Sequence, residues 1–256
     1  MDASYSGIIY RLLRNPRQSL RSLSMDLNIS AQDLNYRMKK INEEGIIKKY
    51  MLHVNPAFYG KKSLYMAFSG DKIYHGRVSS VIKCLEKTTV YGLSGTDEEL
   101  NKKSMEIVDM LGSPEMRYMP ATLEPGVKRI KLDDMIIEQL RMDPLMRTQD
   151  IARALNKKYS TVKRRLDYLI EKRVISIIGR LDLSKLNTVI LGIFTDRIKD
   201  IISRLDESLI IINDDQSGIS LSIEKDIITA KSVIENLRKI DNKIEVMIIY
   251  DYEFFE

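Results

Sequence analysis

Apolar residues near the start of the chain recur at helical spacing in three short stripes. The members of the stripes are Ile8, Ile9 and Leu12, then Leu20, Leu23 and Leu27, then Leu34, Met38 and Ile41. This spacing is that of the buried face of an amphipathic helix, so the pattern predicts three short helices. Only "NIS" separates the second stripe from the third predicted helix, which is typical of a helix-turn-helix.

The same pattern returns 128 residues later. The segment 155–175, "LNKKYSTVKRRLDYLIEKRVI", aligns without a gap with 27–47, "LNISAQDLNYRMKKINEEGII". The apolar pairs are Leu27/Leu155, Leu34/Val162, Met38/Leu166, Ile41/Leu169, Ile46/Val174 and Ile47/Ile175. Upstream, the same offset relates Ile8/Ile136, Ile9/Ile137, Leu12/Leu140, Pro16/Pro144 and Leu23/Ile151. One half of the chain is therefore a diverged copy of the other.

Each helical triplet runs into a segment rich in β-branched residues. These segments are "GIIKKYMLHVNP" at 45–56 and "RVISIIGRLDLS" at 173–184. Such residues around a tight turn predict a short hairpin, or wing, within each copy. Each copy is thus expected to begin with a winged helix-turn-helix.

The pattern then changes to strands alternating with helices. Strands are expected at 188–195, 208–214, 218–224 and 243–253, and helices at 197–207 and 226–239. That βαββαβ order is ferredoxin-like. In the first copy, strands are expected at 63–70, 88–95 and 116–124 and helices at 76–87 and 96–111, so one strand is missing or very short.

The sequence therefore predicts an α+β fold, a tandem duplication of a winged helix-turn-helix followed by a ferredoxin-like βαββαβ domain. The winged units are expected at 1–60 and 127–187, and the ferredoxin-like domains at 61–126 and 188–256. Charge follows these boundaries. The first winged unit has 9 basic and 5 acidic residues (+4) and the second 15 and 8 (+7), whereas 61–126 is neutral and 188–256 is −6. Two basic blocks indicate a polyanionic partner contacted twice.

Composition indicates a globular protein of the cytoplasm. Hydrophobic residues make up 44% of the chain and charged residues 30%, and no apolar run has the roughly 18 residues of a membrane span. The beginning, "MDASYSGIIYRLLRNPRQ", lacks the apolar core of a secretory signal. The one cysteine, Cys84, is expected in the core and suits a reducing compartment. Abundant Ile, Lys and Arg without Trp favour a thermophilic archaeal source.

The stretch "LRSLSMDLNISAQDLNYRMKKINEEGIIKKYMLHVNPAFYG", followed by a ferredoxin-like pattern, resembles the Lrp/AsnC (feast/famine) family of transcription regulators. The second copy is similar, but Arg173 stands where the first has Gly45. The resemblance implies sequence-selective binding of double-stranded DNA, with the ferredoxin-like domains used for dimerisation. Family members often bind amino-acid effectors, but no "GDYDY"-like strand supports a small-molecule effector here.

In this family the third helix of the winged unit enters the major groove, and helical angles select its outer face in the second copy. Arg164 is the predicted base reader, because Arg can bind guanine O6 and N7 together. Lys158, Lys163 and Arg165 are predicted phosphate contacts, and Tyr159, Ser160 and Thr161 complete the DNA-binding set.

The equivalent face of the first copy is less basic. Its predicted DNA-binding residues are Gln32, Asn35, Tyr36, Arg37 and Lys40, and Gln and Asn can read adenine edges. Ser30 and Asp33 resemble a capping box at the start of this helix, whereas Lys158 offers no cap in the second copy. We expect the second copy to bind DNA more tightly and less selectively.

No catalytic residue, metal ligand or cofactor site is predicted, so the chain is not expected to be an enzyme. His53 and His75 are the only histidines; His53, in the first wing, is a candidate surface or phosphate-contact residue. One rival hypothesis is a siroheme-decarboxylase-like enzyme, which would also pair two such units. Another is a winged-helix module that docks on transcription proteins. The two halves could pair within one chain or with a second chain; a homodimer presenting four winged helices is favoured.

Overall fold

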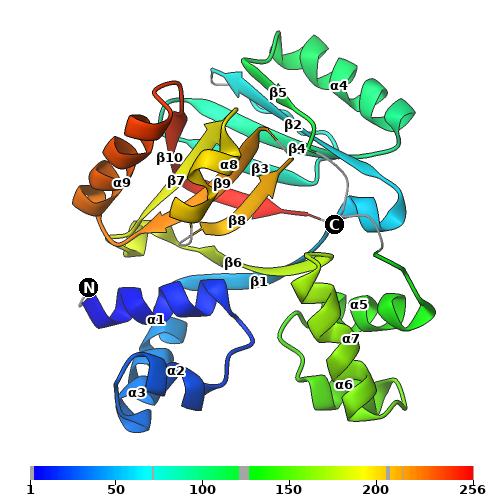
Figure 1. The fold of residues 1–256 in the computed structure, drawn as a ribbon, viewed down its shortest axis with the longest axis vertical. Helices are drawn as coiled ribbons and strands as arrows, with labels where there is room; N and C mark the ends of the chain where they lie inside the picture. Colours follow the sequence, from blue (N-terminus) through cyan, green and yellow to red (C-terminus); the bar gives the residue numbers. More distant parts are fainter. Residues whose placement is uncertain (1–2, 71, 121–126, 206–207, 215, 256) are drawn as a thin grey trace.

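The computed structural model describes residues 3–70, 72–120, 127–205, 208–214 and 216–255. Two groups of three helices lie below a two-stranded ribbon, and an eight-stranded sheet lies above it (Figure 1). The first group is α1 (Ala3–Arg14), α2 (Leu20–Asp26) and α3 (Ala31–Glu43). The second is α5 (Lys131–Met142), α6 (Thr148–Ala154) and α7 (Tyr159–Glu171). Both predicted helical triplets are therefore confirmed.

The two helical groups share backbone conformation as well as sequence pattern. Asn28, after α2, and Asn156, after α6, have positive φ angles of 51° and 50°. Asparagine is one of the few residues that tolerate this left-handed region, which reverses the chain into the third helix. Gly45 after α3 and Arg173 after α7 also match, with φ of 61° and 52°. The second copy thus keeps a left-handed turn that its arginine disfavours.

The wings differ from the sequence prediction. Each copy contributes one continuous strand, β1 (Ile47–Val54) or β6 (Ile175–Leu181), and these two strands pair with each other in antiparallel fashion. The predicted hairpin within each copy is therefore wrong. A lone strand needs hydrogen-bond partners for its backbone, and here the other copy supplies them.

The large sheet has the strand order β5-β2-β4-β3-β10-β7-β9-β8. The first copy supplies β2 (Lys62–Ser69), β3 (Ser80–Cys84), β4 (Thr88–Gly95) and β5 (Met116–Tyr118). The second supplies β7 (Val189–Thr195), β8 (Ser208–Asn213), β9 (Gly218–Glu224) and β10 (Glu245–Phe254). Each half has the same internal order, and the β3–β10 ladder joins them.

One predicted helix of the first half is wrong. The segment 76–87 contains the strand β3, in which Ser80, Ile82 and Cys84 are buried while Val81 and Lys83 are half-buried. This alternation is that of a strand with one face on the core. Among its described residues, the first half therefore has all four strands and no counterpart of the first helix of the βαββαβ order, the reverse of the predicted omission.

The remaining helices cover the sheet. α4 (Asp97–Leu111) lies over the first half and α9 (Ile227–Ile240) over the second (Figure 1). The helix predicted at 197–207 is shorter, with α8 at Ile198–Ile201 and a 3-10 turn at Ile202–Arg204. The last two positions of the predicted helix, 206 and 207, lie outside the described residues. Short 3-10 turns also follow the wing strands, at Pro56–Tyr59 and Leu183–Lys185.

The sheet curls onto itself. The ring of Tyr118, on the edge strand β5, lies 5.8 Å from that of Phe194 on β7, and its hydroxyl donates to the Ser217 carbonyl at 3.0 Å. Side chains from all eight strands then surround an apolar cavity of about 50 Å³. Typical ligand sites are several hundred Å³, so this interior is a packed core. Cys84 is buried in the neighbouring core, as predicted.

Candidate nucleic-acid interface

The two winged units share their cores. Ile178 and Leu181 of β6 pack with the helices of the first unit, and Leu52 of β1 packs with those of the second. Each helical triplet thus buries apolar side chains of the other copy's strand, and this burial stabilises both. The positions of α3 and α7 are therefore set by one interlocked structure.

Arg17 ties the two helical groups together directly. Its guanidinium donates to the carbonyls of Pro144 at 3.1 Å and Met146 at 2.6 Å, both in the turn between α5 and α6. It also reaches the Thr148 hydroxyl at 3.4 Å. Burial lowers the pKa of Arg17, and the nearby Asp143 carboxylate opposes this shift. The residue escaped the sequence analysis because its partners are over 120 positions away.

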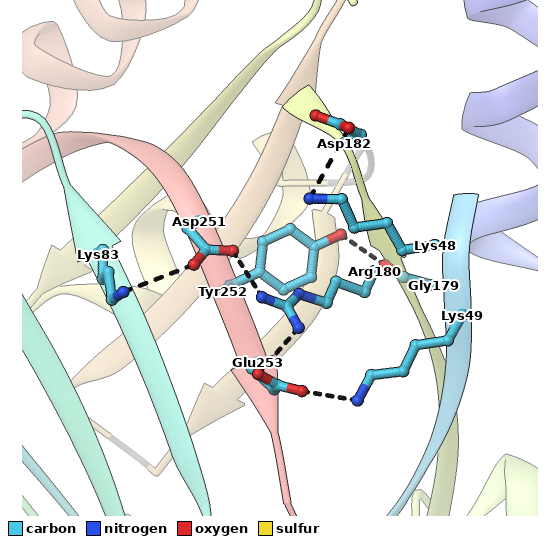
Figure 2. A network of polar contacts seen from close by, with 9 residues as sticks. All are labelled: Lys48, Lys49, Lys83, Gly179, Arg180, Asp182, Asp251, Tyr252 and Glu253. Carbon is cyan, nitrogen blue, oxygen red and sulfur yellow. Dashed lines mark hydrogen bonds and ion pairs between the residues drawn. The ribbon is translucent and has the colours of Figure 1, made fainter. Parts of the chain in front are cut away.

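A charged network joins the wing ribbon to the large sheet (Figure 2). Arg180 of β6 pairs with Asp251 at 3.2 Å and with Glu253 at 2.9 Å, both on β10. Between them, the Tyr252 hydroxyl donates to the Gly179 carbonyl at 2.5 Å. Lysines extend the network: Lys49 to Glu253 at 2.6 Å, Lys83 to Asp251 at 3.7 Å and Lys48 to Asp182 at 3.8 Å. The network holds the ribbon, and with it α3 and α7, in one orientation on the sheet.

The outer face of α7 carries most of its predicted DNA-binding residues in the open. Lys158, Tyr159, Ser160, Lys163 and Arg164 are exposed, and Thr161 is half-buried. Lys163 pairs with Asp167 at 2.5 Å, which raises its pKa. No hydrogen bond or ion pair engages Arg164 within the part of the chain that the structure describes. Lys158 makes no side-chain cap at the start of α7.

Arg165 has a different position from the one predicted. Its guanidinium faces inward to the fully buried carboxylate of Asp133 on α5, donating through both Nε and Nη2, the latter at 2.7 Å. It also donates to the Lys128 carbonyl at 2.6 Å and stacks on the Tyr168 ring at 4.2 Å. The hydrogen bond to Asp133 raises the pKa of Arg165. The predicted phosphate contact is replaced by an ion pair that fixes α7 on α5.

On α3, Gln32, Asn35, Tyr36 and Lys40 are exposed, as expected of a reading face. Tyr36 keeps 65% of its surface accessible. These four residues occupy the positions of Ser160, Lys163, Arg164 and Tyr168 on α7, because the offset of 128 residues carries each onto its counterpart. The outer faces of α3 and α7 therefore have the same placement and different chemistry.

Arg37, the counterpart of Arg165, also points inward. It is half-buried, pairs with Asp33 at 2.8 Å and lies over the Tyr5 ring at 5.2 Å. This geometry differs from the predicted DNA contact. Ser30 accepts from the Asp33 backbone N–H at 3.0 Å, which confirms the predicted cap of α3. The Asp33 carboxylate, which was expected to complete the capping box, accepts a hydrogen bond from the Arg37 guanidinium.

His53 lies in β1 against the sheet. Its ring packs edge-on to Phe254 at 5.8 Å, and burial lowers its pKa to about 4. A phosphate contact needs an accessible, charged imidazole, so the predicted role is not supported by its position. At the end of the chain, Tyr252 and Phe254 are core residues, whereas Tyr250 and Phe255 are exposed.

Within the described ranges, His, Cys, Asp and Glu do not gather into groups of three or more that could hold a metal ion. The helices of the same ranges are too short or too polar to cross a membrane. Asp133 was missed by the sequence analysis, although its place in the first turn of α5 gave a weak signal, since carboxylates are common there.

Comparison with known proteins gives one curated relative and several distant structures. The HTH-type transcriptional regulator FL11 of Pyrococcus furiosus is 30% identical over 130 residues, covering 45% of this chain and 82% of that protein. No family model matches the chain. The siroheme decarboxylase NirDL, solved with an iron-uroporphyrin III analogue, is 12% identical with a TM-score of 0.46, covering 97% of this chain and 92% of that one. A transcriptional regulator of Neisseria meningitidis, solved with L-Met, is 14% identical with a TM-score of 0.33, covering 51% and 94%.

Proposed function

The chain belongs to the Lrp/AsnC family of helix-turn-helix transcriptional regulators, and from this membership we propose that it binds double-stranded DNA through the outer faces of α3 and α7. Each helix is the second of a helix-turn-helix, the element that enters the major groove in this class of protein. DNA binding of this kind makes the protein a regulator of transcription in the cytoplasm, and we assign it no catalytic role.

The observation that carries the proposal is the exposed cationic face of α7. Lys158, Lys163 and Arg164 lie in the open beside the hydroxyl of Ser160 and the ring of Tyr159. Cations arranged along a groove-sized helix neutralise phosphates and release counterions, which supplies most of the affinity for DNA. Arg164 is exposed on this face, makes no hydrogen bond or ion pair with the described residues, and is the proposed base reader.

A single chain already contains the pairing that a homodimer would otherwise provide. The wing strands and the ferredoxin-like halves already pair within one chain, which favours the intrachain alternative of the sequence analysis. The homodimer with four winged helices stays a prediction.

The test is a double variant, Lys163→Ala with Arg164→Ala. We expect affinity for duplex DNA to fall at least about 30-fold, because a base contact and a phosphate contact are lost. The slope of log K against log salt should decrease by about 1 for the lost phosphate contact. Fluorescence anisotropy with a labelled duplex, titrated at several salt concentrations, measures both.

The matched control lies on α9. Lys231 and Arg238 are exposed, and Lys231 pairs with Glu235 at i,i+4, as Lys163 does with Asp167. Replacing Lys231 and Arg238 by Ala changes the net charge equally, far from the proposed interface, and should leave affinity unchanged. Equal losses in the two double variants would refute the assignment of α7 as a DNA-reading helix.

A further inference from the structure

We propose that one chain is a complete reader of a non-palindromic DNA site, with α3 and α7 contacting two different half-sites in a fixed order. This inference rests on the proposed DNA binding and specifies the sequence class of the DNA. Three properties of the structure support it: a symmetric frame, unlike reading faces, and a fixed link between them.

The frame has the symmetry of a dimer. In the wing ribbon, Tyr50 pairs with Gly179 and Met51 with Ile178. The offset of 128 residues carries Tyr50 onto Ile178 and Met51 onto Gly179, so exchanging the copies reproduces the same register. A local two-fold axis therefore passes through the ribbon and relates α3 to α7. Two-fold readers place their helices in two half-sites that are read in opposite directions.

The reading faces break that symmetry. α3 presents the amides of Gln32 and Asn35, which suit adenine N6 and N7. At the positions of Asn35 and Tyr36, α7 presents Lys163, a proposed phosphate contact, and Arg164, whose guanidinium suits guanine O6 and N7. The two half-sites should therefore differ in sequence, with adenine contacts under α3 and guanine contacts under α7.

Charge adds a second asymmetry. Lys40 is the exposed cation among the reading residues of α3, whereas α7 has Lys158, Lys163 and Arg164. Phosphate contacts anchor a protein without reading sequence, and base contacts supply selectivity. The α7 half-site should supply most of the affinity, and the α3 half-site should supply more of the selectivity.

The order and spacing of the half-sites are fixed by covalent and polar links. Both helices belong to one chain, and their units share the β1–β6 ladder. Arg17 binds the α5–α6 turn through the Pro144 and Met146 carbonyls. Two-fold helix-turn-helix readers use half-sites about one helical turn, roughly 34–36 Å, apart, and we expect this spacing here. One chain then covers both half-sites and needs no partner to do so.

The experiment begins with selection of bound duplexes from a random pool by the full chain. The selected site is then compared with two palindromes, each built by repeating one of its half-sites at the same spacing. We expect the selected site to bind at least about tenfold more tightly than either palindrome, because each palindrome mismatches one helix. Sedimentation analysis should give one chain per selected site.

A variant with an α7-like face on α3 should prefer the palindrome of α7 half-sites to the selected site. Gln32→Ser, Asn35→Lys and Tyr36→Arg exchange exposed residues for their α7 counterparts. This variant should bind the palindrome of α7 half-sites at least about tenfold more tightly than the wild type does. Because the exchanged side chains are exposed, the fold should be kept, and circular dichroism checks this.

The outcomes separate this inference from the proposed function. Absence of binding to every duplex at low salt would overturn the proposed function and this inference with it. Selection of a palindrome, or two chains on each selected site, would overturn the inference alone. Selection of a non-palindromic site bound by one chain would support both.

Discussion

The helices α3 and α7 occupy corresponding places in the two winged units, and they differ mainly where they face outward. The buried positions of α3 and α7 keep their apolar character, as in Leu34/Val162 and Ile41/Leu169. The exposed positions have diverged, from Asn35 and Tyr36 to Lys163 and Arg164. Packing constrains a buried side chain tightly, because a cavity or a clash costs several kcal/mol, whereas the surface tolerates change. The two helices thus share their packing and differ in the chemistry of their outer faces.

The two units also differ inside, in the partner of an inward-facing arginine. Arg37 and Arg165 are counterparts, and both join the third helix of their unit to the first. Arg37 lies over the ring of Tyr5, but Arg165 binds the buried carboxylate of Asp133, which stands at the position of Tyr5. The second unit therefore has a buried ion pair where the first has an aromatic contact.

Replacing Arg165 by Met should cause the largest loss of stability. It leaves the Asp133 carboxylate buried without its cation, which typically costs about 3–5 kcal/mol. Arg37→Met removes a half-exposed ion pair and a cation–π contact, so its cost should be about 1 kcal/mol. Urea unfolding followed by circular dichroism at neutral pH measures both free energies of unfolding.

The double variant Asp133→Leu with Arg165→Met serves as the control. An apolar pair of similar volume can replace a buried ion pair at little cost, so most of the lost stability should return. Similar losses for Arg37→Met and Arg165→Met would contradict the contrast between the two units.

The wing strands differ in their response to pH. His53 of β1 is half-buried against Phe254, and its counterpart on β6 is the buried Leu181. Burial lowers the pKa of His53 to about 4, below its ordinary value of about 6.5, so the folded protein holds this imidazole neutral. Between these values the unfolded chain binds the proton and the folded chain does not, so stability falls as the pH falls from about 6.5 to about 4.

The full loss is on the order of 2–3 kcal/mol. His53→Leu, which gives β1 the residue of β6, should remove it. The free energy of unfolding in urea at about pH 7 and about pH 5 is compared for the two proteins. The pKa values of the Asp182 and Asp226 carboxylates are also lowered. The stabilisation that these carboxylates give the folded protein is lost at lower pH, equally in the wild type and the variant. A wild type and variant with equal pH dependence would show that His53 is not the group responsible.

The sequence predicts the periodic parts of this molecule well, because helical stripes and the repeat depend on local spacing. The helices α3 and α7 and the exposed side of each follow directly from it. Pairing of β1 with β6 could not be predicted, because nothing local selects a strand's hydrogen-bond partner. At β3, the run of Val81, Ile82 and Cys84 is too short to separate a strand from a helix by periodicity. Arg165 was misplaced because its partner lies 32 positions earlier, on another helix.

The smallest expected effect concerns the turns that follow α3 and α7. Gly45 and Arg173 both have a left-handed backbone, with φ of 61° and 52°. A residue with a Cβ atom pays roughly 1–2 kcal/mol in this region, and glycine avoids that cost but loses more entropy on folding. Arg173→Gly should therefore stabilise the protein by up to about 1 kcal/mol, and Gly45→Arg should destabilise it by a similar amount. Arg173→Ala keeps the Cβ atom and should give no gain in urea unfolding. If alanine stabilised the protein as much as glycine, the arginine side chain rather than the backbone would be the source of the cost.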